Sequence, residues 1–272
     1  MTLGDSSIGF ALGATVGIIL AITGAGGGVL AVPILIFVLG LPVHKAAPIA
    51  LFTVGVAATF GALIGLREGT VRYRAALLIG GVGMLAAPIG SALARVTPSG
   101  PLMVLFAVVL AYSARSMYQR SQPGHDLLLP PHPRCELCTI AGRLLWTRPC
   151  ARALALIGAC SGLLSGLLGV GGGFVIVPAL TRFTGMSARN VVNTSLLVIA
   201  LVSVAGTGSA VVHDLIVWSV AGPFCGGAAG ALLIGRRYLS QMSGASAQRS
   251  FAALSFVAAI LLAWHGLHAM VG

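Results

Sequence analysis

Charged residues are scarce in this 272-residue chain, and acidic residues are the scarcest. Charged side chains make up 8% of the sequence, and only five of them are Asp or Glu. Soluble globular domains carry about 25% charged residues, so this composition excludes a water-soluble globule. Hydrophobic residues make up 57% of the chain, and the mean hydropathy is +1.02. The sequence therefore predicts an integral membrane protein.

The chain also lacks the motifs of the common enzyme classes. It has no phosphate-binding P-loop, no cluster of metal ligands within its apolar runs, and no spacing of Ser, His and Asp that predicts a catalytic triad. The acids all lie at or outside the expected helix ends, which leaves no carboxylate for a proton relay at membrane depth: Asp5, Glu68, Asp126, Glu136 and Asp214. We expect neither an enzyme nor a resident cofactor.

Eight apolar runs follow one another along the chain. They cover approximately residues 8–40, 46–66, 75–94, 101–118, 153–181, 191–212, 215–235 and 250–272. The first and the fifth are too long for one crossing, because a straight helix over 8–40 would measure about 50 Å against a hydrocarbon core of about 30 Å. Each of these two runs is therefore either a strongly tilted helix or a hairpin that reverses at its glycines.

The positions of the cations favour the hairpin. If each long run crosses once, the two faces carry nine and seven Lys or Arg residues. If each long run returns to its own side, fourteen lie on one face and only Lys45 and Arg95 on the other. Because cytoplasmic loops hold the excess of Lys and Arg, the second arrangement is favoured. The net charge of +11 has the same explanation, so we expect no nucleic-acid binding.

A hairpin followed by three spans is an odd unit, so the second half must lie upside down relative to the first. We expect an all-α polytopic membrane protein of two inverted repeats, 1–118 and 153–272, each a glycine-broken helical hairpin plus three transmembrane helices, with about 8–10 helices in all. Residues 119–152 are expected in the cytoplasm and both termini outside. With arms of about 12–16 residues, re-entrant and fully crossing hairpins both remain open.

The N-terminal residues bear on whether a signal peptide is removed. The first seven residues lack the positive region of a signal peptide, so we expect no cleavage there.

Each long run contains a glycine cluster of the form G-x-G-G-G with a proline five residues after its last glycine, and the two copies lie 145 residues apart. Glycine permits positive φ and close backbone approach, so consecutive N–H groups can point into one concavity. The helix that follows adds the positive end of its dipole. The alternative is close helix packing, since small residues line helix contacts in lipid. We predict a midplane site for a small anion, formed by Gly24, Gly26, Gly27, Gly28, Gly169, Gly171, Gly172 and Gly173.

A polar helix start follows the second cluster. Asn193, Thr194 and Ser195 either donate amide and hydroxyl hydrogen bonds to the oxygens of an anion or cap the helix. The first-half counterpart, Pro48-Ile49-Ala50, has no such polar groups. We therefore expect an asymmetric substrate site that also includes Asn193, Thr194 and Ser195.

The segment 119–152 contains His132, Cys135 and Cys138 in the spacing H-x-x-C-x-x-C, followed by Cys150. Reduced thiols in the cytoplasm could hold zinc in this arrangement. A redox-active C-x-x-C and a linker with incidental cysteines are the alternatives, and the linker is favoured because no thioredoxin-like context surrounds the motif. We predict no metal site here.

The repeated glycine cluster with its proline, the N-T-S helix start and the small-residue runs around Gly80–Gly90 and Gly226–Gly230 together resemble the sulfite exporter TauE/SafE family. The resemblance implies an inner-membrane carrier of bacterial type that exports small anions such as sulfite or organosulfonates. The chain departs from the family pattern at Pro48-Ile49-Ala50, where the resemblance implies a small polar pair.

These observations predict a secondary transporter that exports sulfite or an organosulfonate by alternating access. Two alternatives stay open, namely a non-transporting membrane subunit and a passive anion channel. The expected partners are the anion and the lipid bilayer. The small residues of Gly226-x-x-x-Gly230 suit either internal packing or a homodimer contact.

Overall fold

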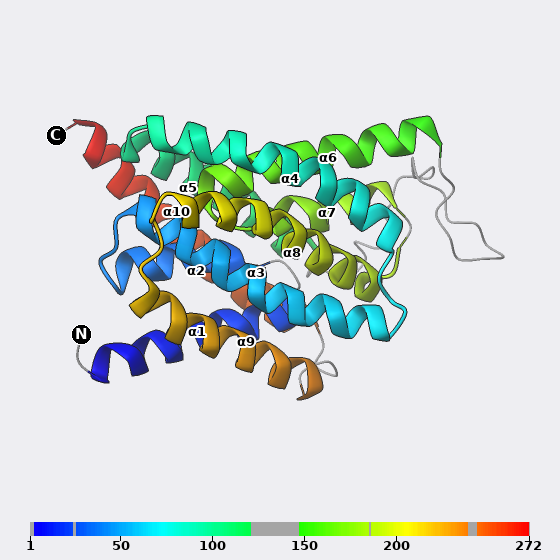
Figure 1. Cartoon of the computed structure of the whole chain (residues 1–272), viewed down its shortest axis with the longest axis horizontal. Coiled ribbons are helices and arrows are strands. Elements are labelled where there is room, and N and C mark those ends of the chain that lie inside the picture. Colours follow the sequence, from blue (N-terminus) through cyan, green and yellow to red (C-terminus); the bar gives the residue numbers. More distant parts are fainter. Residues whose placement is uncertain (1–2, 24–25, 121–146, 185, 239–243, 272) are drawn as a thin grey trace.

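The computed structural model describes the chain except for residues 1–2, 24–25, 121–146, 185, 239–243 and 272. The described ranges form ten α-helices and no β-sheet (Figure 1). The helices are α1 (Leu3–Thr23), α2 (Gly26–Phe37), α3 (Val43–Arg67), α4 (Tyr73–Val96), α5 (Ser99–Arg120), α6 (Arg148–Leu168), α7 (Gly173–Phe183), α8 (Ala188–Val212), α9 (Trp218–Tyr238) and α10 (Gly244–Val271). Within α3, α4, α5, α6, α8 and α9 lie segments long and apolar enough to cross a membrane. An all-helical, multi-pass membrane protein is thereby confirmed.

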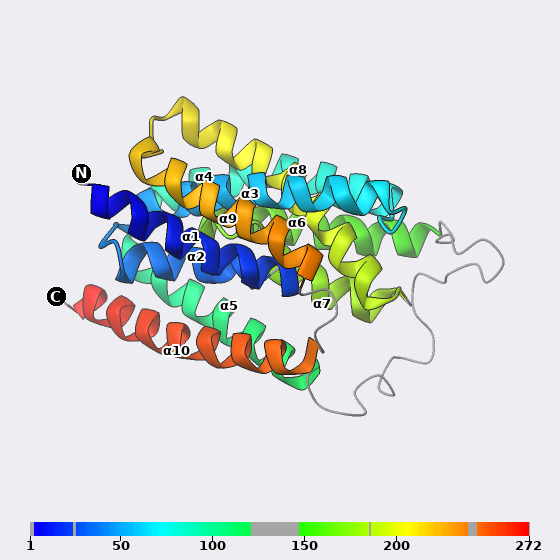
Figure 2. The same cartoon turned by 90° about the horizontal axis from the view of Figure 1, so that it is seen from below.

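Both long apolar runs are broken into two helices at their glycine clusters. The helix α1 enters the bundle from one end and α2 returns toward that end, while α6 and α7 do the same from the opposite end (Figures 1 and 2). The second arms are short, with 12 residues in α2 and 11 in α7. The first arms have 21 residues each, or about 31 Å. The prediction of arms of 12–16 residues was wrong for these two helices, because both begin several residues before the apolar run.

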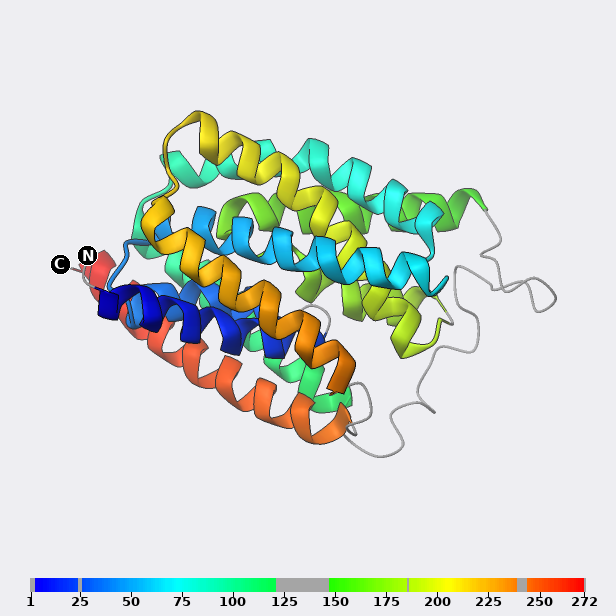
Figure 3. The same cartoon turned by 60° about the horizontal axis from the view of Figure 1, so that its bottom comes forward.

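The two ends of the bundle differ in charge. The end of the bundle at which α1 begins and α10 ends is called the terminal end, and it also contains the α2–α3, α4–α5 and α8–α9 turns (Figure 3). The opposite end, called the Asn193 end, contains the α3–α4 turn and the start of α8. Among the described lysine and arginine residues, Lys45 and Arg95 lie at the terminal end and the others at the Asn193 end. This asymmetry is the pattern on which the positive-inside rule acts.

The helices of the two halves match in position. The helix α3 begins at Val43 and α8 begins at Ala188, 145 residues later, and the same spacing separates the starts of α1 and α6, α4 and α9, and α5 and α10. The turns after α3 and α8 also match, since Gly69 and Asp214 both have positive φ and each donates its N–H at 3.1 Å to the carbonyl three residues earlier. Asp214 thus adopts a backbone conformation that non-glycine residues seldom take.

Glycines bring two helix pairs into backbone contact. The most extensive helix contacts include α4 with α6 and α1 with α9. A Cβ atom on Gly162 of α6 would lie 2.1 Å from the carbonyl oxygen of Gly83 in α4. A Cβ atom on Gly227 of α9 would lie 2.1 Å from the carbonyl oxygen of Phe10 in α1. Gly227 therefore serves internal packing, whereas open space surrounds Gly230, and the homodimer stays a prediction.

We expect Gly162→Val to destabilise the fold by about 3 kcal/mol or more, because the added atoms meet the backbone of α4, which cannot move aside as a side chain can. Gly81→Val on α4 is the matched control, since nothing lies within 4 Å of a Cβ at that position. Melting temperatures of the two variants in detergent provide the measurement. Equal melting temperatures would contradict the close-packing interpretation.

Candidate functional site

The second glycine cluster forms a buried turn between α6 and α7. Gly169, Gly171 and Gly172 have φ of +71°, +77° and +68°, in the left-handed region that glycine populates without a Cβ penalty. Gly169 ends α6 and donates its N–H to the carbonyl of Ser165 at 2.8 Å. Gly173 begins α7, and all of the residues from 169 to 173 are buried. This turn, residues 169–173, is called the second tip below.

After Gly169, the backbone donors of the second tip have no acceptor among the described residues. The N–H groups from Val170 to Phe174 donate no hydrogen bond to any other residue that the structure describes. Val175 and Ile176 are the first to find an acceptor, both at the carbonyl of Gly172. Buried N–H groups are almost always paired in proteins, so a run of unpaired donors indicates a ligand or ordered water. Because the run also lies at the N-terminus of α7, an anion is the ligand that it suits best.

The first glycine cluster, residues 24–28, is called the first tip, and its described part meets the second tip inside the bundle. Gly24 lies outside the described residues, Gly26 begins α2, and Gly27 and Gly28 are buried. A Cβ atom on Gly28 would lie 2.3 Å from the carbonyl oxygen of Val170, so the two tips are in backbone contact. The two clusters, 145 residues apart in the chain, are therefore neighbours in the bundle.

The second tip has polar neighbours and the first has apolar ones. A Cβ on Gly27 would meet the carbonyl of Val16 at 2.7 Å and the Leu20 side chain, and a Cβ on Gly172 would meet the carbonyl of Ser161 at 2.6 Å. Ser161 and Ser165 thus occupy in α6 the places that Val16 and Leu20 occupy in α1. The region is asymmetric, with its hydroxyl groups beside the second tip.

Two buried hydroxyls beside the second tip have no hydrogen-bond partner among the described residues. Ser165 is fully buried and Ser203 is 2% exposed, and neither Oγ is paired. The Oγ of Ser203, on α8, lies 3.8 Å from the position of a Cβ on Gly171. An unpaired buried hydroxyl costs about 1–3 kcal/mol, so both groups are stabilised by any ligand that accepts from them.

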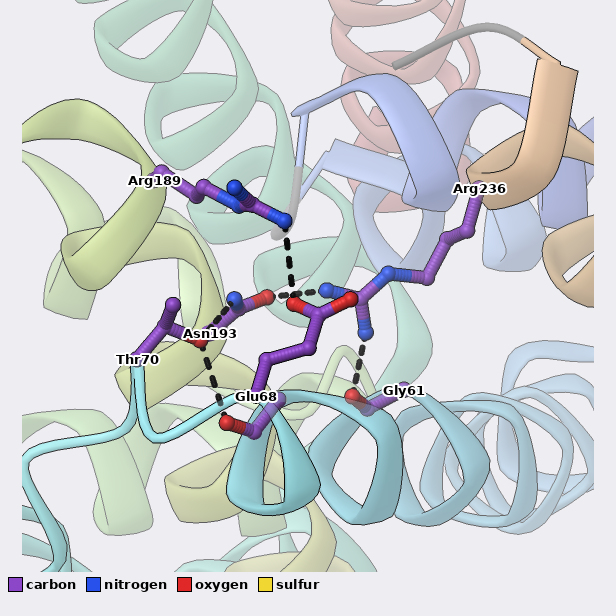
Figure 4. Close-up of polar contacts among 7 residues, drawn as sticks. Gly61, Glu68, Thr70, Arg189, Asn193 and Arg236 are labelled. Carbon is purple, nitrogen blue, oxygen red and sulfur yellow. Dashed lines mark hydrogen bonds and ion pairs between the residues drawn. The ribbon is translucent and has the colours of Figure 1, made fainter.

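A second polar group of residues lies at the Asn193 end (Figure 4). The Asn193 side chain is fully buried, donates from Nδ2 to Thr70 Oγ1 at 2.6 Å, and accepts at Oδ1 from Arg236. Arg236 also donates to the carbonyl of Gly61. Thr194 accepts the N–H of Arg72 at 3.1 Å. These contacts, here called the Asn193 network, join the α3–α4 region of the first half to α8 and α9 of the second.

An ion pair flanks the Asn193 network at the surface. Arg189 and Glu68 lie 3.2 Å apart, with 70% and 36% of their side chains exposed. An exposed pair of this kind contributes about 0–1 kcal/mol, so the buried amide carries more of the stability of this end.

Comparison with known proteins identifies the family of the chain. The sulfite exporter TauE/SafE family model matches residues 9–262. The chain belongs to the sulfite exporter TauE/SafE family. A "Probable membrane transporter protein" of Xylella fastidiosa (strain 9a5c) is 29% identical over 280 residues and the match covers both chains fully. The "Probable membrane transporter protein YdhB" of Bacillus subtilis (strain 168) is 28% identical over 220 residues, which cover 79% of this chain and 84% of that protein. No solved structure matches the chain.

The family assignment confirms two expectations. The resemblance noted from the glycine clusters is correct, and the family and its named relatives are membrane transporters rather than enzymes. The TauE/SafE chain is therefore a membrane transporter by family.

The structure brings together some of the predicted site residues of this TauE/SafE protein and separates others. The glycines of the two tips meet, as described above. Asn193, Thr194 and Ser195 are buried at the Asn193 end, where their polar atoms bond to neighbouring residues; the Ser195 hydroxyl donates to the carbonyl of Val192 at 2.7 Å. In this conformation Asn193 and Thr194 bond to residues outside α8, whereas the bond from Ser195 to Val192 lies within α8, and the contact of the trio with substrate stays a prediction.

Sequence reasoning missed Ser165, Ser203 and Arg236. Ser203 belongs to the run Val202-Ser203-Val204-Ala205, where no motif marks it. Arg236 was included only as one of the fourteen Lys or Arg residues on the cation-rich face. A comparison of the two repeats could have singled out Ser165, because Ser165 stands at the position that corresponds to Leu20 in the first repeat.

The weak metal candidates fall mostly outside the described residues, as His132, Cys135 and Cys138 do. Cys150 is described, buried and disulfide-bonded, so it has no free thiolate for a metal in this structure. Among the described residues of the TauE/SafE chain, no group of three His, Cys, Asp or Glu side chains is placed to hold a metal.

Proposed function

We propose that this TauE/SafE protein exports a small sulfur oxyanion, sulfite or an organosulfonate, across the inner membrane by alternating access. The observation that carries the proposal is the run of unpaired, buried N–H groups from Val170 to Phe174. Fixed backbone dipoles at a helix N-terminus stabilise an anion without a buried cation. A site without a full countercharge also releases its ligand more readily than an ion pair would, which a carrier requires.

We further propose that the two halves are inverted repeats around this site. The matching helix starts, the matching turns at Gly69 and Asp214, and the entry of the two hairpins from opposite ends support the proposal. The excess of arginine at the Asn193 end supports an orientation with that end and residues 119–152 in the cytoplasm and both termini outside. Alternating access then amounts to a movement of one half against the other around the tips.

The driving force needs no carboxylate relay. Asp5 lies in the first turn of α1, and Glu68 and Asp214 follow the ends of α3 and α8, so none of the described acids lies in the middle of a helix. The inside-negative potential expels anions by itself, and one charge moved across 100 mV is worth about 2.3 kcal/mol. Export down the electrochemical gradient of the anion is therefore sufficient.

Counter-flow in liposomes tests the proposal. Purified protein is reconstituted, loaded with unlabelled sulfite or methanesulfonate, and supplied outside with the labelled anion, with and without a pH gradient. A carrier gives saturable uptake that requires the trapped anion. Flux that neither saturates nor shows counter-flow would indicate a channel, and no flux of either anion in folded protein would refute the assignment.

Ser203→Ala should raise the apparent KM for the anion about tenfold without lowering the melting temperature. The Oγ of Ser203 has no partner among the described residues, so its removal breaks no hydrogen bond to them, whereas a bound anion loses a donor. Ser255→Ala is the control, because Ser255 on α10 is also fully buried and unpaired. A loss of stability without a change in KM would assign Ser203 a packing role instead.

A further inference from the structure

A cavity of about 400 Å³ opens at the terminal end, between the start of α3 and the ends of α4, α6 and α8. Among the described residues that line it none is acidic, and the charged or titratable ones are Arg95 and His44. Ser91 and Ser209 lie in its wall with their hydroxyl oxygens 3.4 Å apart. Gly169, the first residue of the second tip, also lines it. The cavity thus extends from the terminal end to the first residue of the second tip.

We propose that this cavity is the oxyanion-binding vestibule of the terminal end, in which Arg95 and the Ser91–Ser209 hydroxyl pair hold the anion before or after it occupies the second tip. The proposal rests on the proposed function and adds residues to it. Arginine is suited to this role because its planar guanidinium donates two parallel hydrogen bonds to an oxyanion. The volume exceeds that of a short sulfonate and leaves room for part of its hydration shell, at about 30 Å³ per water.

The opposite end supports this assignment. There the Asn193 network joins the two halves through buried hydrogen bonds, whereas at the terminal end a cavity lies between α3 and α4 of the first half and α6 and α8 of the second, bordered by the Ser91–Ser209 contact. A carrier open at one end and closed at the other has this arrangement in one of its two states. The vestibule is therefore the access path of the state that opens toward the termini.

The test measures the charge preference of the cavity independently of transport. Ser209→Cys is introduced into the full chain with Cys160→Ala and Cys225→Ala, the two free cysteines among the described residues. The protein is then labelled with an anionic and a cationic methanethiosulfonate of similar size, and the rate of labelling by each is measured. The anionic-to-cationic ratio of these rates is divided by the same ratio for 2-mercaptoethanol, which removes the intrinsic difference in reactivity between the two reagents. We expect the anionic reagent to be favoured about tenfold, and Arg95→Gln to remove most of that preference. Gly208→Cys is the control, since Gly208 is exposed and does not line the cavity.

Protection identifies the ligand. Methanesulfonate, which does not attack thiosulfonates as sulfite would, should slow labelling of the cysteine at 209 in phosphatidylcholine liposomes and lose this effect in Arg95→Gln. Protection only when phosphatidylglycerol is present would assign the cavity to a lipid headgroup and overturn the proposal. If the normalised anionic-to-cationic labelling ratio is near one while the wild-type protein transports the anion normally, the vestibule is refuted and the proposed export function stands. A favoured anionic reagent without flux in the wild type supports the vestibule and refutes export.

Discussion

Gly171→Ala is expected to lower anion transport at least about 100-fold in protein that still inserts and folds. Gly171 has φ of +77°, a conformation that costs an L-residue about 1–2 kcal/mol. Its added Cβ would lie 3.0 Å from Ile199 Cγ2, 3.5 Å from Val54 Cγ1 and 3.8 Å from Ser203 Oγ. The methyl group therefore enters the space between the unpaired N–H groups of the second tip and the unpaired hydroxyl, where the anion is proposed to bind.

The control for this variant is Gly40→Ala. Gly40 has φ of +63° in the turn between α2 and α3, and nothing lies within 4 Å of a Cβ there. It carries the same backbone strain without reaching the tips, so its counter-flow should equal that of the wild type. A substitution at 171 tests the anion site more directly than one at 172, because a Cβ on Gly172 would also clash with the carbonyl oxygen of Ser161 at 2.6 Å. Equal flux in the two alanine variants would refute the anion site at the second tip.

Asn193→Leu is expected to destabilise the protein by about 2–4 kcal/mol. The substitution removes both hydrogen bonds of a fully buried amide and leaves the half-buried Arg236 guanidinium and the Thr70 hydroxyl without that partner. The melting temperature in detergent should fall by about 10 °C. Asn190→Leu, on the same helix, is the control, because the Asn190 side chain makes no hydrogen bond to other described residues.

The same pair of variants decides between two roles for Asn193. If Asn193 holds the Asn193 end closed, stability and transport fall together, and Thr70→Val reproduces part of the loss because it removes only one of the two hydrogen bonds. A variant as stable as Asn190→Leu but inactive in counter-flow would instead indicate direct contact with the anion. That outcome would contradict the structural role and support the substrate-binding role predicted from the N-T-S helix start.

Local features of the sequence determined the membrane class, the helices and the breaks in the two long runs. In lipid a spanning segment must satisfy its backbone hydrogen bonds within itself, so apolar length alone identifies the helices. The glycine clusters at 24–28 and 169–173 marked the interruptions, because few other residues adopt positive φ. Composition and motif together were enough to indicate the family that the comparisons then showed.

Only the tertiary structure decided which side chains meet. Ser203 lies beside Gly171, Asn193 bonds to Thr70 and Arg236, and the cavity joins Arg95 to Gly169. These contacts depend on the rotation and register of helices that are apolar nearly all round, and such helices carry no periodic pattern from which a facing side could be read. The sequence therefore determined where the chain breaks, and the packing of the two halves decided which polar groups gather at the breaks and where the cavity lies.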